Sequence, residues 1–294
     1  MNTVRADRFL TLRVAAPLMA LARTRALRIP ILMYHSISRD IDEHDIHPYY
    51  RIATTPEVFN QHMTFLSNQG YQAVSLDFAV KYLRKEHGLY ESLPTKPVVI
   101  TFDDGLRDFY INAFPILDKY GFSATVFLPA AMIKDRPATV ERKERMAWQE
   151  VKALHKEGII FGSHTMTHAQ LRTMWIKEIE FELKCSKDTI EDKLGIAVES
   201  FSYPYAFPEG YSSFVAYLLK ALRKCGYKNG VSTRIGVATP EGNDLFLKRI
   251  PVNSCDDNEL FHAKLAGAYD WLSYIQHASK SLSAKLGWCL NRLS

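Results

Sequence analysis

The chain has 294 residues, a formal net charge of +5 at pH 7 and a hydrophobic fraction of 47%. These values are ordinary for a globular protein and argue against a disordered chain, a fibre or a polytopic membrane protein. The excess of basic residues is small and scattered, so it indicates no nucleic-acid partner. The four cysteines lie far apart and form no Cys-x-x-Cys pair, which argues against a disulfide framework or a structural zinc site.

Residues 1–29 form a basic, partly apolar N-terminal segment. Arg5 and Arg8 precede an apolar stretch from Phe9 to Ala22, and further arginines follow it. The pattern has some likeness to a signal peptide, but Arg13 interrupts it and the uninterrupted part is too short to span a bilayer. A basic amphipathic segment lying on the domain or on a membrane surface fits at least as well. We therefore expect a protein that is cytoplasmic or peripheral at the membrane, with export by an atypical signal segment as the alternative.

From residue 30 onward, strand-like apolar runs alternate with helical patterns. The expected strands are residues 31–34, 71–75, 97–102, 124–128, 159–161, 199–203, 230–232 and 246–250. Helical patterns follow most of them, and about seven or eight such units predict an α/β barrel with parallel strands, complete or slightly irregular. We expect a single catalytic domain over residues 30–270, followed by an amphipathic C-terminal helix over residues 271–294.

Two adjacent carboxylates stand where the apolar run 97–102 ends. In α/β barrels the chemistry lies at the carboxyl ends of the strands, which is where Asp103 and Asp104 fall. Adjacent residues of an extended chain point in opposite directions, so the chain must bend there if one carboxylate is to bind a cation while the other faces substrate. Taken alone, Asp-Asp-Gly is also an ordinary capped turn.

A pair of histidines, His164 and His168, follows the expected strand 159–161. Histidines four residues apart meet on one face of a helical turn, which is a familiar metal-ligand spacing. Together with Asp104 they would supply two imidazoles and one carboxylate. Such a set leaves coordination positions open, as a catalytic metal requires.

A third motif, Phe201 to Ala206, follows another strand and by itself is compatible with a rigid proline turn in the core. In combination, residues 101–105, residues 164–168 and the Pro204-Tyr205 turn resemble the polysaccharide deacetylases of carbohydrate esterase family 4. The spacing from Trp148 to His168 is similar to that family too. The likeness extends over roughly residues 30–252.

This resemblance implies a distorted (β/α)7-type barrel that holds one divalent metal. Asp104, His164 and His168 match the family's metal ligands, and Asp103 matches its catalytic base. Tyr205 matches the residue whose backbone N–H helps to hold the oxyanion. Zinc suits the ligand set, and cobalt, nickel or iron fit the same ligand types. The candidate substrate-binding residues are Trp148, Tyr203 and Pro204. The rings of Trp148 and Tyr203 could stack on a sugar.

The sequence departs from the common family pattern in two places. Ser202 stands where the family often has an arginine that orients the base, and the late Leu-x-His that supplies an acid is absent. The early Met33 to Ile37 segment instead resembles the branch that acts on poly-N-acetylglucosamine, with a catalytic histidine near the start. His35 is therefore the expected acid, and His262 is the second candidate for this role. Arg249, at the end of a late strand, is the expected replacement for the arginine that orients the base.

The sequence thus predicts a metal-dependent hydrolase that removes N-acetyl groups from N-acetylhexosamine units of a polysaccharide or its precursor. Two alternatives stay open: a catalytically silent glycan-binding barrel in exopolysaccharide assembly, and another metal-dependent amidohydrolase. The expected partner is the carbohydrate substrate. We expect no nucleic-acid partner, and the basic N-terminal segment leaves peripheral contact with a membrane open.

Overall fold

The computed structural model describes residues 5–22, 27–39, 51–85, 94–136 and 144–276. Most of the helix expected over residues 271–294 lies outside the described residues. Within the described part, no helix combines the length and the apolar character needed to cross a membrane.

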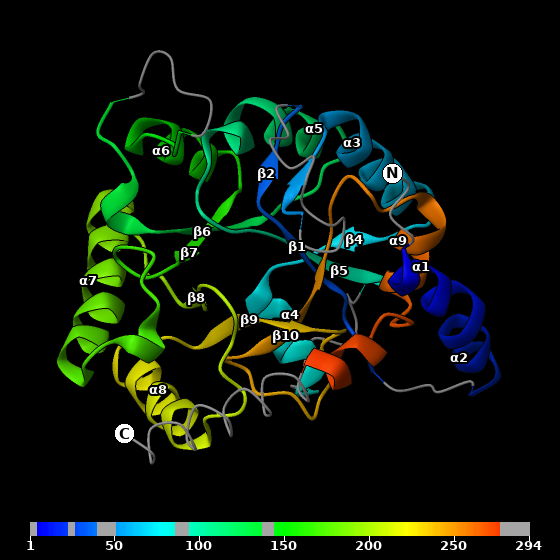
Figure 1. Ribbon diagram of the computed structural model, residues 1–294. Coiled ribbons are helices and arrows are strands. Elements are labelled where there is room, and N and C mark those ends of the chain that lie inside the picture. Colours follow the sequence, from blue (N-terminus) through cyan, green and yellow to red (C-terminus); the bar gives the residue numbers. More distant parts are fainter. Residues whose placement is uncertain (1–4, 23–26, 40–50, 86–93, 137–143, 277–294) are drawn as a thin grey trace.

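Seven parallel strands close into a barrel, and helices pack around it (Figure 1). The strand order is β1-β10-β9-β8-β7-β6-β5, and β5 pairs with β1 to complete the circle. The distorted (β/α)7-type barrel expected from the sequence is thereby confirmed. The barrel strands are β1 (Ile31–Tyr34), β5 (Pro97–Phe102), β6 (Thr125–Leu128), β7 (Ile160–Ser163), β8 (Ser200–Ser202), β9 (Asn229–Ile235) and β10 (Leu247–Pro251).

Three short strands lie outside this circle. β4 (Gln72–Ala73) pairs with the first residues of β5, while β2 (Ser36–Ile37) and β3 (Ala53–Thr54) form a separate two-stranded sheet. The α-helices are α1 (Ala6–Leu10), α2 (Ala16–Ala22), α3 (Pro56–Asn68), α4 (Leu76–Leu83), α5 (Phe114–Lys119), α6 (Trp148–Lys156), α7 (Ile176–Leu194), α8 (Ser212–Lys224) and α9 (Asn258–Leu265).

Local signals explain several of these boundaries. The Thr55 hydroxyl accepts a hydrogen bond from the backbone N–H of Val58, which caps α3 ahead of its first-turn proline. The strand expected over residues 71–75 is shorter than predicted. Its last residue, Ser75, instead accepts a hydrogen bond from Phe78 N–H and caps α4, a helix that the sequence analysis missed.

Aromatic packing fixes the carboxyl end of β5. All six residues of this strand are buried, as expected for a parallel strand covered on both faces. The Phe102 ring stacks on Tyr34 of β1 at 5.4 Å between centroids and meets the edge of Phe109 at 4.7 Å. Such ring pairs favour one fixed geometry. The two carboxylates that follow Phe102 therefore leave a rigid strand end.

Candidate active site

The chain turns sharply where β5 ends. Asp104 adopts φ 71° and Gly105 φ 60°, both in the left-handed region. This conformation disfavours a non-glycine residue by roughly 1–2 kcal/mol, so the surrounding structure must hold Asp104 in place. The bend expected from the sequence is present. Asp103 points toward Arg249, and Asp104 points toward the two histidines.

Asp104, His164 and His168 converge on one point. The Asp104 Oδ1 atom lies 3.0 Å from His168 Nε2 and 3.5 Å from His164 Nε2, and the three ligand atoms all lie within 4.8 Å of one another. His164 Nδ1 lies 2.8 Å from the carbonyl oxygen of Ser202. A carbonyl only accepts, so Nδ1 carries the proton and Nε2 presents its lone pair to the cluster. The cluster fits a single divalent cation with two imidazole ligands and one carboxylate ligand.

The two histidines do not lie on a helical turn, so that part of the sequence prediction is wrong. Residues 164–170 form an irregular loop, with Thr165 at φ 66° and His168 at φ 58°. Glu182 of α7 holds this loop. Its carboxylate accepts the backbone N–H groups of Met166 (2.8 Å) and Thr167 (2.9 Å), and also the Thr167 hydroxyl (2.7 Å). These three hydrogen bonds bring the histidines together without a helix. Glu182 carried no signal in the sequence beyond its place in a charged helix.

Arg249, at the middle of β10, binds Asp103 through two parallel hydrogen bonds of 2.8 and 2.7 Å. Its remaining donors reach the carbonyl of Ser232 and the hydroxyls of Thr101 and Ser202. Every N–H of the guanidinium therefore has an acceptor, although the side chain is 0% exposed. The structure thus brings Arg249 to the carboxylate that the sequence analysis assigned to it.

His35 lies just beyond β1, on the open side of this pair. Its Nε2 atom is 3.9 Å from Asp103 Oδ2, and its side chain is partly exposed. By contrast, His262 is exposed on α9, where its ring faces Phe65 at 5.6 Å. The structure groups His35, and not His262, with Asp103.

Charge and burial act in opposite directions on these groups. Burial acts to raise the pKa of Asp103, but the charge and hydrogen bonds of Arg249 outweigh it and lower that pKa to about 2. Burial lowers the pKa of His35, and the Asp103 carboxylate opposes this only in part. The pKa of His164 is raised despite burial, because Asp103 and Asp104 both favour its charged form. Asp103 is therefore ionised at neutral pH.

The predicted substrate contacts differ in their placement. Tyr203 and Trp148 are 1% and 5% exposed and belong to the hydrophobic core, and Pro204 is buried too. Neither aromatic ring offers a face for stacking on a sugar, which corrects that expectation. Tyr205 is 52% exposed, adopts φ 58° and lies against His168, with 4.6 Å between the ring centroids. Tyr205 is thus the aromatic residue at the open side of the cluster.

Comparison with known proteins identifies the family of this chain. Residues 90–230 match the polysaccharide deacetylase family. The Bacillus subtilis (strain 168) protein YxkH, which is named after this family, is 30% identical over 226 residues, covering 77% of this chain and 72% of the relative. The chain therefore belongs to the polysaccharide deacetylase family, a class of enzymes that act on polysaccharides.

Two further similar proteins have names that specify the substrate or a bound ligand. The poly-beta-1,6-N-acetyl-D-glucosamine N-deacetylase of Staphylococcus aureus (strain MRSA252) is 26% identical over 186 residues, which cover 59% of this chain and 61% of that protein. The Streptococcus pyogenes deacetylase PplD, solved in complex with acetate, matches with 27% identity and a TM-score of 0.69, covering 82% of this chain and 99% of PplD.

Proposed function

We propose that this protein is a metal-dependent hydrolase that removes N-acetyl groups from N-acetylhexosamine units of a polysaccharide or its precursor. The convergence of Asp104, His164 and His168 beside the Arg249-bound Asp103 carries the proposal. The name of the Staphylococcus aureus relative supports the substrate class, and the acetate in PplD supports the acetyl group as the part released.

The ligand set would hold one divalent cation, with zinc as the expected metal and cobalt, nickel or iron as alternatives. When bound, such a cation lowers the pKa of water and polarises a carbonyl oxygen. Asp103 accepts the proton of the water that attacks the acetyl carbonyl, and Arg249 keeps that carboxylate ionised and oriented. The backbone N–H of Tyr205 helps to hold the oxyanion. His35 donates a proton to the leaving nitrogen, so that acetate and a free amine result.

Replacing the ligands separately from the base tests this division of roles. We expect Asp104→Ala, His164→Ala and His168→Ala to lose bound metal and acetate release together. Asp103→Asn should keep the metal and lose most turnover, because it removes a proton acceptor and not a ligand. Metal content by elemental analysis and acetate release from a panel of acetylated glycans are the measurements.

Two outcomes would contradict the proposal. Equal metal loss in all four variants would remove the distinction between base and ligands. If the unmodified protein bound no metal and released no acetate from any glycan, the alternative of a silent glycan-binding barrel would replace the hydrolase. Acetate release from small amides alone would favour another metal-dependent amidohydrolase.

Glu182 offers a second test, because it touches the ligand loop and not the metal set itself. Glu182→Ala removes the acceptor of two backbone N–H groups and one hydroxyl between the histidines. We expect zinc affinity to fall about 10–100-fold, as for other groups that orient metal ligands. Competition with a chelator of known affinity measures this. Asp192→Ala, at an exposed position on the same helix, is the control; a Glu182 variant with the affinity of this control would contradict the role.

A further inference from the structure

The described chain begins with a continuous helical stretch, which we call the 6–22 run. It consists of α1, a π-helical turn over Thr11–Ala15 and α2. Its exposed positions recur every three or four residues and form one stripe along the run. Apart from Arg13, the stripe is apolar: it contains Ala6, Phe9, Leu10, Val14, Pro17, Leu18, Ala20 and Leu21. Phe9 and Leu18 are each 61% exposed and Leu21 is 80% exposed.

The side chains of the run that are fully buried against the domain are polar. Asp7 and Thr11 are buried, and they accept hydrogen bonds from the Tyr269 hydroxyl (2.8 Å) and the Trp271 indole N–H (3.0 Å). Arg5 donates to the carbonyl oxygen of Cys255. A helix that docks on its own domain normally turns its apolar side inward. Here the two buried side chains are polar, the inward apolar side chains such as Leu12 and Met19 are only half-buried, and the larger apolar side chains Phe9, Leu18 and Leu21 point outward.

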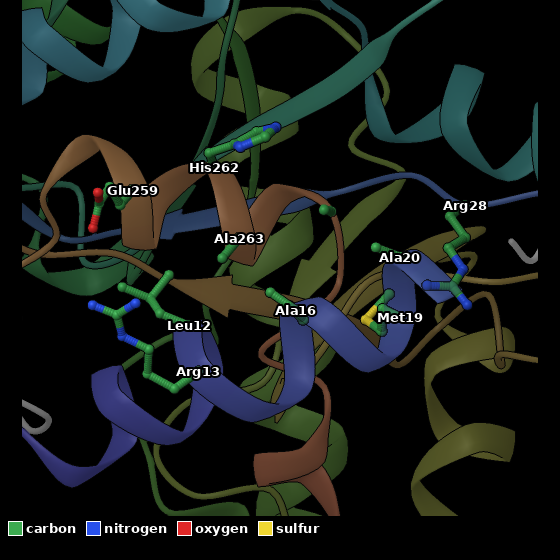
Figure 2. Close-up of a pocket in the computed structure, with 11 residues that line it drawn as sticks. Leu12, Arg13, Ala16, Met19, Ala20, Arg28, Glu259, His262 and Ala263 are labelled. Atoms are coloured by element: carbon green, nitrogen blue, oxygen red, sulfur yellow. The ribbon is translucent and has the colours of Figure 1, made fainter. Parts of the chain in front are cut away.

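The inner side of the run is only loosely packed. A groove of about 680 Å³ lies between the run and α9. Figure 2 shows Ala16 and Met19 on one wall of it and His262 and Ala263 on the other. Among the described residues, no member of the run belongs to a hydrophobic core cluster. The apolar side chains of the run are therefore not needed by the core.

The charges beside the stripe indicate what covers it. Arg13 lies within the stripe and also borders the groove, and Arg28 borders the groove at its other end (Figure 2). Arg23 and Arg25 follow the run in the sequence. Apolar side chains next to arginines suit the boundary between the headgroups and acyl chains of an anionic membrane.

We propose that the 6–22 run holds the enzyme on an anionic membrane surface, with its axis in the plane of the membrane. At 1.5 Å per residue the run is roughly 25 Å long. Because Asp7 and Thr11 bond the inner side of the run to the domain, the outward stripe alone enters the lipid. Arg5 reaches Cys255, in the loop after β10, and the chain leaving the run leads to β1. The run therefore extends beside the barrel from its mouth end, so the active site would open next to the membrane.

Vesicle co-sedimentation of the full chain tests this proposal. We expect the protein to bind phosphatidylcholine vesicles that contain phosphatidylglycerol, and to bind pure phosphatidylcholine weakly. Leu18→Ser/Leu21→Ser should weaken partitioning into the anionic vesicles at least about tenfold, since two exposed leucines would no longer be buried in lipid. Arg13→Gln should weaken it about fivefold, and only on the anionic vesicles. Acetate release from a soluble glycan and the melting temperature should be unchanged.

Ile176→Ser/Phe181→Ser is the matched control. These side chains are 59% and 57% exposed on α7, which lies across the barrel from α1 and α2 in Figure 1. The control pair should leave vesicle binding intact. The proposal fails if the unmodified protein ignores anionic vesicles or if both pairs lose binding equally. If the Leu18/Leu21 pair instead abolishes self-association measured without lipid, the stripe is an interface between two copies and the membrane role is wrong.

Discussion

Arg249→Met should lower the free energy of unfolding by about 3–5 kcal/mol, the usual effect of breaking a buried ion pair by removing one partner. The guanidinium is 0% exposed and the Asp103 carboxylate is 2% exposed, so water cannot replace the lost hydrogen bonds. The variant leaves Asp103 as a buried, uncompensated charge. Turnover should fall too, since the carboxylate then takes up a proton more readily and loses its fixed orientation.

Urea unfolding of the metal-free protein measures this effect, and a double variant separates charge from packing. Arg249→Met/Asp103→Asn removes both charges and should regain much of the stability that either single change loses, without regaining acetate release. Lys228→Met breaks an exposed ion pair with Glu199 and should change stability by about 1 kcal/mol or less. If Arg249→Met costs no more than this control, the buried pair is not a major source of stability.

The same pair predicts how stability depends on pH. The folded protein lowers the pKa of Asp103 from 3.8 to about 2, so its contribution is complete above the unfolded value and is lost as the pH falls through the folded one. Between about pH 4 and pH 2, the stability of the unmodified protein should therefore fall more steeply than that of the Arg249→Met/Asp103→Asn variant. Equal slopes would contradict the lowered pKa.

Much of the barrel could be predicted because its signals are local. The buried run at β5, the cap at Thr55 and the glycine that ends α7 each lie within a few residues of the boundary they define. The short β2–β3 pair was missed because its two strands are distant in the sequence and have only two residues each. Pairing of such short strands depends on tertiary contacts rather than on propensity.

In the candidate site, too, local motifs could be predicted and contacts between distant segments mostly could not. Asp104, His164 and His168 were predicted because the motifs that contain them are short and stand directly after strands. The pairing of Arg249 with Asp103 was predicted from the family pattern, although the two residues are 146 positions apart. The other three acceptors, on Thr101, Ser202 and Ser232, were not predicted, since only the closed barrel brings them to the guanidinium. The histidine loop was misassigned as a helical turn because the left-handed backbone at His168 depends on the loop that Glu182 holds.

The 6–22 run shows a further limit of sequence patterns. Its periodicity indicates an amphipathic helix but not which side meets the domain. Only the contacts of Asp7 and Thr11 reveal which side of the run is bonded to the domain and which apolar side chains are left outside. The membrane proposal therefore depends on the structure, although the sequence already left that possibility open.

His35→Ala should slow hydrolysis of an acetamide sugar by about 10²–10⁴-fold, the usual range for losing a general acid. An amine anion is a very poor leaving group, so breaking the amide requires a proton on the nitrogen. The His35 Nε2 atom lies 3.9 Å from Asp103 Oδ2. His35 is not one of the three residues that could hold the metal. Metal content and folding should therefore be unaffected.

The leaving group distinguishes this role from simple damage to the site. An activated acetyl ester needs little proton assistance, so its hydrolysis by the His35→Ala variant should fall far less than that of the acetamide. His262→Ala removes a histidine exposed on α9 and should slow neither substrate. Rates on both substrates, measured with the metal content of each variant, provide the test. Equal loss on the ester and the acetamide would mean that His35 positions Asp103 or the substrate, because only a proton donor acts selectively on the poorer leaving group.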